Sequence, residues 1–100
     1  MQFIFRWNGQ YYGFIANGHL FDSTAGYRGW VESDGSVWRS DGVFVGNLVG
    51  GEYVLLQRSE ARSNHTQRAR PPVPAAPARP DDRPARAERS GYVDGLNDVR

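Results

Sequence analysis

Apolar and polar side chains alternate along the first half of the chain. In residues 2–7, Phe3, Phe5 and Trp7 fall on one face of an extended chain, and Ile4 falls on the other. A period of two residues is typical of a strand with one buried face. Similar short runs follow to about residue 57, and no stretch of about eleven residues without glycine carries the spacing of an amphipathic helix. We therefore expect an all-β body.

Four turn signals divide these runs into hairpins. They are Asn-Gly at 8–9 and 17–18, Asp-Gly at 34–35 and Gly-Gly at 50–51. A type I′ turn requires positive φ at both central residues, which these residue types tolerate best. The sequence therefore predicts four consecutive β-hairpins, which must share one core because an isolated hairpin is marginal in water. They form either a curled or barrel-like meander of seven or eight strands, or a small flower-like arrangement about a pseudo-fourfold axis.

Three glycines recur within the predicted strands. Gly13, Gly29 and Gly46 are separated by 16 and 17 residues and occupy the same place in successive repeats. A glycine inside a strand weakens it and often marks a bend or a close approach of two backbones. We expect each repeat to begin at a bend where strands crowd together.

Composition changes abruptly after the hairpins. Twelve of the thirteen aromatic residues lie at or before residue 53, and all six prolines lie at or after residue 71. We expect residues 1–57 to form the all-β domain and residues 58–89 to form a Pro/Ala/Arg-rich linker, extended as polyproline II or disordered. Apolar residues return in residues 90–100, which we interpret as a short docking motif for its own body, a neighbouring subunit or another protein. Its candidate residues are Tyr92, Val93 and Leu96.

The aromatic residues of the body are the candidate binding surface. Trp7 and Tyr12 flank the first turn, and Trp30 and Trp38 flank the third. A body of this size buries only about 60% of its unfolded surface, so some rings are expected to face a cleft or another subunit. We therefore expect a homo-oligomer first, and a protein, peptide or lipid-like ligand second. The structural alternative is that these rings form cross-strand pairs that hold the hairpins together.

Charge separates the two halves of the chain. Residues 1–56 carry a net charge of −2, the remainder carries +3, and the chain has no lysine. An arginine-rich tail suits an anionic partner, either nucleic acid or a membrane surface, and this is the alternative function. Nucleic acid is disfavoured, because acidic residues interrupt the tail and base stacking requires exposed aromatic rings beside a basic groove.

Residues that would carry chemistry are scarce. The chain has no cysteine, and its two histidines, His19 and His65, lack the spacing of metal ligands. No serine stands in a nucleophile elbow, and no glycine pattern matches a phosphate-binding loop. We therefore predict a non-enzymatic protein without catalytic residues, metal or cofactor. Without a signal peptide or an apolar stretch of about 20 residues, we expect no transmembrane segment and a cytoplasmic location.

Several of these motifs together resemble a known domain. The runs YGFIANGHLFD at 12–22, GWVE at 29–32, DGSVW at 34–38 and GVFVG at 42–46 are similar to the bacterial four-fold beta flower domain. The resemblance covers about residues 3–56, and the closing GYVDGL is similar to the end of some members after a comparable Pro/Arg-rich spacer. It implies four hairpins about a pseudo-fourfold axis and supplies no catalytic residue.

Overall fold

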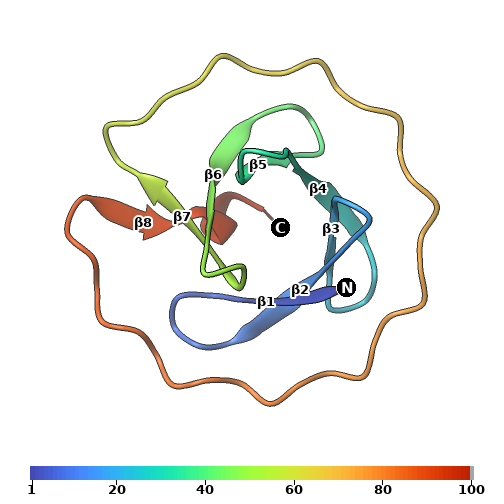
Figure 1. The fold of residues 1–100 in the computed structure, drawn as a ribbon, viewed down its shortest axis with the longest axis horizontal. Coiled ribbons are helices and arrows are strands. Elements are labelled where there is room, and N and C mark those ends of the chain that lie inside the picture. Colours follow the sequence, from blue (N-terminus) through green and yellow to red (C-terminus); the bar gives the residue numbers. More distant parts are fainter. Residues whose placement is uncertain (100) are drawn as a thin grey trace.

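The structure, a computed structural model, describes residues 1–99. It contains one eight-stranded antiparallel sheet in which every strand pairs with its neighbours in sequence, curled into a half-barrel (Figure 1). The elements are β1 (Gln2–Phe5), β2 (Tyr11–Ala16), β3 (His19–Asp22), β4 (Tyr27–Val31), β5 (Ser36–Arg39), β6 (Phe44–Val49), β7 (Tyr53–Gln57), β8 (Tyr92–Asp94) and the 3₁₀-helix η1 (Gly95–Asp98). The all-β class and the repeated hairpins are confirmed, and the connectivity is that of a curled meander.

Each of the four predicted turns joins two strands. The signal at 8–9 connects β1 to β2, and the signals at 17–18, 34–35 and 50–51 connect β2 to β3, β4 to β5 and β6 to β7. Asn17 and Gly18 have φ values of 52° and 78°, as a type I′ turn requires. Seven strands come from residues 1–57, and β8 joins them from the C-terminal segment by pairing with β7.

The three recurring glycines lie where two backbones approach closely, as predicted. A Cβ atom on Gly13, Gly29 or Gly46 would clash with a carbonyl oxygen of the neighbouring strand. Each of the three directly follows the extra residue of a β-bulge. These extra residues are Tyr12, Arg28 and Val45, at which the register between the two paired strands shifts. A bulge bends the strand that carries it, and three bulges at this regular spacing curl the sheet.

The first bulge changes which residues of β2 share a face of the sheet. Simple alternation along β2 places Tyr12 on the same face as Phe14. The extra residue reverses this, so that Tyr12 packs with Ile15 while Phe14 packs on the opposite face with Phe21. Side chains still alternate between the two faces on either side of the bulge, but the bulge shifts the phase of this alternation by one residue.

The concave face of the sheet holds an aliphatic cluster, which we call the inner core. Most of its members are β-branched or leucine side chains that point into the curl. They are Ile4, Tyr12, Ile15, Leu20, Val37, Val45 and Val54 from the sheet, and Leu96 and Val99 from the C-terminal segment. Leu96 and Val99 are 0% and 1% exposed, and η1 lies inside the curl of the sheet (Figure 1).

The convex face carries most of the rings, and we call it the outer aromatic surface. Its side chains form three clusters around the sheet. They are Phe14, Phe21 and Tyr27; Phe5, Tyr11 and Tyr53 with Phe3 and Trp7; and Trp30, Trp38 and Phe44. These rings contact one another across strands, as in the stacked Trp30–Trp38 pair with centroids 6.3 Å apart.

Residues 58–91 connect β7 to β8 and are called the belt. The belt leaves the end of β7, runs around the whole convex face and returns to place β8 beside β7 (Figure 1). The molecule is a flattened disc with extents of 37 × 35 × 21 Å. The region read from composition as an extended linker is therefore a chain that lies against the outer aromatic surface.

Candidate functional site

The belt presents every third residue to the body. Pro71, Pro74, Pro77 and Pro80 are partly buried, while the residues between them are exposed. The same phase continues on one side through Arg68, His65 and Arg62, and on the other through Arg83, Arg86 and Arg89. Polyproline II has three residues per turn, so a chain in this conformation directs one row of side chains toward the sheet.

The belt arginines lie on the rings of the outer aromatic surface. Seven of the eight arginines in residues 58–91 place the guanidinium carbon within about 6 Å of a ring centre, the range of a cation–π interaction. The distances are 4.6 Å for Arg62 on Phe44, 4.7 Å for Arg68 on Trp30, 6.0 Å for Arg70 on Tyr27, 5.6 Å for Arg79 on Tyr11, 4.1 Å for Arg83 on Phe5, 5.0 Å for Arg86 on Trp7 and 5.4 Å for Arg89 on Trp7. All three ring clusters are contacted, so the belt covers the surface around its circumference.

Carboxylates of the body hold several of these arginines in place. Arg68 pairs with Glu32 at 2.8 Å, and Arg83 pairs with Glu52. The hydrogen bond from Arg83 holds the pKa of Glu52 below its ordinary value of 4.5. The guanidinium groups of Arg68 and Arg83 thus each have a ring beneath them and a carboxylate beside them, which fixes their orientation.

Main-chain hydrogen bonds fix the belt at two turns. The amide of His65 donates to the carbonyl of Gly42 at 2.7 Å, and the amide of Arg83 donates to the carbonyl of Gly9 at 2.7 Å. A Cβ atom on either glycine would clash with the belt carbonyl above it. The amide of Arg86 donates to the carbonyl of Trp7 at 2.9 Å. These glycines therefore allow two backbones to lie directly against each other.

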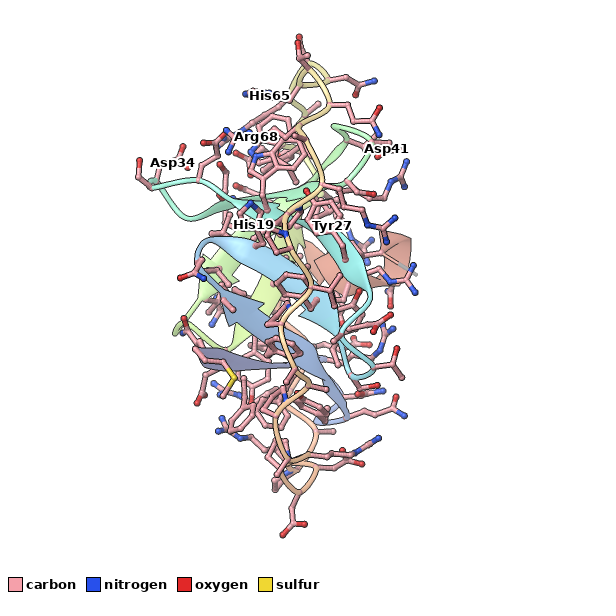
Figure 2. All side chains as sticks on the ribbon, turned by 90° about the vertical axis from the view of Figure 1, so that its right-hand side faces the viewer. His19, Tyr27, Asp34, Asp41, His65 and Arg68 are labelled. Atoms are coloured by element: carbon pink, nitrogen blue, oxygen red, sulfur yellow. The ribbon has the colours of Figure 1, made fainter. Side chains whose placement is uncertain are left out.

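The most developed contact surrounds the two stacked tryptophans. The His65 ring stands edge-on to both, with centroids 5.6 Å from Trp30 and 5.1 Å from Trp38. Figure 2 looks onto the belt as it crosses the strands, with His65 and Arg68 at one end and Tyr27 beside their path. The indole of Trp38 donates to the hydroxyl of Ser36 at 3.0 Å, which fixes the orientation of the ring.

The structure separates the four candidate binding residues. Trp30 and Trp38 lie together on the outer aromatic surface, and Trp7 lies in the neighbouring cluster, where its indole donates to the carbonyl of Ala87 at 2.8 Å. Tyr12 lies in the inner core, and its hydroxyl donates to the carbonyl of Val99 at 3.2 Å. Trp7 and Tyr12 therefore do not form one surface, because they lie in clusters on opposite faces of the sheet.

The belt explains how the aromatic rings of the body are buried. The expectation that some rings face a cleft or another subunit treated residues 1–57 alone. The same chain supplies the cover, and Trp30, for example, is 0% exposed. Self-association is therefore not required to bury the rings and stays a proposal.

The candidate docking motif lies on its own body in this structure. Tyr92 and Val93 pair with Gln57 and Leu56 of β7, and Leu96 enters the inner core. Asp94 fixes the entry into η1, because its carboxylate accepts the amide of Leu96 at 2.9 Å and the amide of Trp7 at 3.1 Å. The motif thus adds both a strand to the sheet and a side chain to the core.

Sequence reasoning missed the belt residues that contact the rings. Their signal was the three-residue recurrence of arginine, histidine and proline from Arg62 to Arg89. Composition alone conceals this recurrence, because it counts prolines and arginines without regard to their phase. Val99 is one of the apolar residues of the C-terminal segment but was not among the candidate docking residues, because a single valine near a polar terminus carries no periodicity.

Comparisons with protein-family models, curated proteins and solved structures gave no match to this chain. Among the side chains that the structure describes, no group of three or more acidic or histidine residues is placed to hold a metal ion. No helix in this part of the chain has the length and apolar character needed to cross a membrane.

Proposed function

We propose that this protein is a non-enzymatic β scaffold whose outer aromatic surface binds extended polypeptides that carry arginine or proline at every third residue. The belt is the resident ligand of this surface. The observation that carries the proposal is the match between the three-residue recurrence of the belt and the ring clusters that it contacts. Proline-rich chains are recognised elsewhere by aromatic grooves in the same way, because polyproline II is already formed before binding.

Charge complementarity supports this role. The belt contains eight arginines and four acidic residues, and residues 1–56 carry a net charge of −2. Guanidinium groups are planar and weakly hydrated, so they can lie on rings while their N–H groups pair with carboxylates. A chain with the same spacing of arginine and proline would find the same contacts.

The tether sets the conditions under which another chain binds. A ligand attached by a short linker acts at an effective concentration in the millimolar range. An external peptide therefore has to compete with the belt, and it binds best when the belt is weakened. The surface then works as a binding site that its own chain keeps covered.

A fluorescent peptide with the sequence of residues 60–91 tests the proposal. It is titrated into the full-length protein and into a variant with Arg83→Gln and Arg86→Gln, which loosens the resident belt. We expect tighter binding to the variant, measured by fluorescence anisotropy. The control peptide has the same composition but no three-residue recurrence, and equal binding of both peptides would show simple charge attraction and contradict the proposal.

Self-association is a second candidate function, and the C-terminal segment favours it. Leu96 and Val99 complete the inner core. The segment that carries them is covalently joined to the rest of the sheet only by the 34 residues between Gln57 and Tyr92. Extended at about 3.1 Å per residue, such a connection reaches about 100 Å. We propose that β8 and η1 of one copy can occupy the body of another, because exchange of an identical element is a low-cost route to dimers.

Cysteine pairing tests the exchange directly, since the chain has no cysteine of its own. One preparation carries Gln57→Cys and the other carries Tyr92→Cys, at positions that pair across β7 and β8. After mixing, unfolding and refolding at high concentration, oxidation should yield a covalent heterodimer, detected by non-reducing electrophoresis. A matched mixture with Ser23→Cys in place of Gln57→Cys should not, and equal yields from both mixtures would contradict the exchange.

The resemblance to the four-fold beta flower domain remains part of this proposal. The bulges before Gly13, Gly29 and Gly46 support a repeated hairpin unit. An experimental structure in which the four hairpin units superpose by successive quarter-turns would establish the symmetry.

A further inference from the structure

The belt closes over an open cleft where it returns to the sheet. This arginine cleft has a volume of about 1010 Å³ and lies between the β1–β2 turn and the end of the belt. The lining includes Arg6 and Trp7 from the first hairpin, Arg58 at the start of the belt, and Arg86 and Arg89 near its end. A cleft of this size is in the upper range for small-molecule sites.

The arginines of this cleft differ from those of the rest of the belt. Arg62, Arg68, Arg79 and Arg83 each form an ion pair with a carboxylate. In the part of the chain that the structure describes, Arg6, Arg58, Arg86 and Arg89 form none. Four guanidinium groups that form no ion pair with a described carboxylate therefore line one cleft.

The two acidic residues of the cleft do not neutralise these arginines. Asp94 accepts the amides of Trp7 and Leu96 and serves to fix the backbone. Glu88 lines the cleft but forms no ion pair with a described residue. Counting all six side chains, the cleft keeps a formal charge of +2 from four arginines and two acids.

We propose that the arginine cleft binds a compact organic anion that carries two or more phosphate groups. The formal charge calls for more than one negative charge, and the volume exceeds that of a single phosphate. Arg86 and Arg89 lie on the ring of Trp7 at 5.0 and 5.4 Å, an arrangement that leaves the N–H groups at their edges available. Guanidinium groups held in this way suit bidentate hydrogen bonds to phosphate oxygens.

Calorimetric titration of the full-length protein tests this proposal, with pyrophosphate and ATP as probes and orthophosphate as the singly phosphorylated comparison. We expect binding of both probes and at least tenfold weaker binding of orthophosphate. Arg58→Gln removes an exposed arginine of the cleft and should weaken ATP binding about tenfold. The matched control is Arg70→Gln, because Arg70 also forms no ion pair with a described residue and lies outside the cleft on Tyr27.

A variant that strengthens binding separates the proposal from loss of folding. Glu88→Gln removes the opposing charge from the cleft and should tighten ATP binding about threefold. Equal weakening by Arg58→Gln and Arg70→Gln would indicate general charge attraction and overturn the proposal. Failure of both pyrophosphate and ATP to bind at about 1 mM would overturn it as well. So would binding that occurs only to phosphatidylcholine vesicles containing phosphatidic acid, which would assign the cleft to a membrane surface.

Discussion

The two faces of the sheet are covered by the same C-terminal half of the chain, but by different chemistry. The inner core receives Leu96 and Val99, which are buried among aliphatic side chains. The outer aromatic surface receives a polar belt whose arginines lie on rings and whose outward residues are exposed. Burial of apolar side chains is non-directional and strong, whereas each cation–π contact at a surface is weak and depends on geometry. We therefore expect the inner contacts to hold the fold together and the outer contacts to open without unfolding it.

The largest effect is expected from Leu96→Ala. The substitution leaves a cavity in the inner core, where Leu96 is 0% exposed. It should lower the free energy of unfolding by about 2–5 kcal/mol in urea denaturation. Val73→Ala, at a belt residue that is 57% exposed, is the control and should change it by less than about 0.5 kcal/mol. Similar losses in both variants would show that the two regions do not differ as proposed.

A smaller and local effect is expected from Arg83→Gln. This change removes the contact at 4.1 Å with the Phe5 ring and the ion pair with Glu52. We expect a small loss of stability, confined to opening of the belt. Hydrogen exchange should become faster at the belt amides of His65 and Arg86 but stay unchanged in the strands. Faster exchange throughout the sheet would mean that the belt is part of the cooperative core.

Acid should also loosen the belt, because it protonates carboxylates that hold the belt in place. The pKa of Glu52 lies below its ordinary 4.5 because Arg83 donates to it, and the pKa of Asp82 lies below 3.8 because the Tyr11 amide donates to it. A lowered pKa contributes stability above the ordinary value, and this contribution is lost as the pH falls through the lower value of the folded protein. Amide chemical shifts of Tyr11 and Arg83 should therefore change as the pH falls below 4.5. In Glu52→Gln the change at Arg83 should disappear, and its persistence would assign it to another group.

The smallest effects are expected at two tyrosines beneath the belt. The hydroxyls of Tyr11 and Tyr27 are buried without a hydrogen-bond partner in the described structure. Replacing either residue by phenylalanine removes an unsatisfied group, so the free energy of unfolding should stay within about 0.5 kcal/mol or rise. Tyr12→Phe is the matched comparison, because it loses the bond to Val99 and should cost about 1 kcal/mol. A clear loss in Tyr11→Phe would reveal a hydrogen bond to water.

Local signals in the sequence were sufficient to predict the hairpins. The turn residues require a particular backbone conformation, and Gly13, Gly29 and Gly46 mark close approaches that leave no room for a side chain. These are constraints between neighbours in sequence or between adjacent strands. They could therefore be read without knowledge of the complete fold.

The long-range contacts could not be predicted in the same way. The phase shift at Tyr12 depends on a register between two strands, and the burial of Val99 depends on a chain that returns from residue 57 after a full circuit. The candidate site was predicted only in part from the sequence, which singled out Trp30 and Trp38. Their partner His65 was not, because a belt with no apolar face gives no hydrophobic pattern.

Because the belt runs around the outside of the sheet, the chain can be cut within it and the two pieces can still form one folded unit. A protease that cuts at the exposed Ala75–Ala76 bond would divide the polypeptide, yet β7–β8 pairing and the buried Leu96 would keep the two pieces together. The protein therefore offers a natural site for fragment complementation. Two separately made polypeptides, one ending and one beginning in the proline-rich stretch, should reassemble into the native sheet.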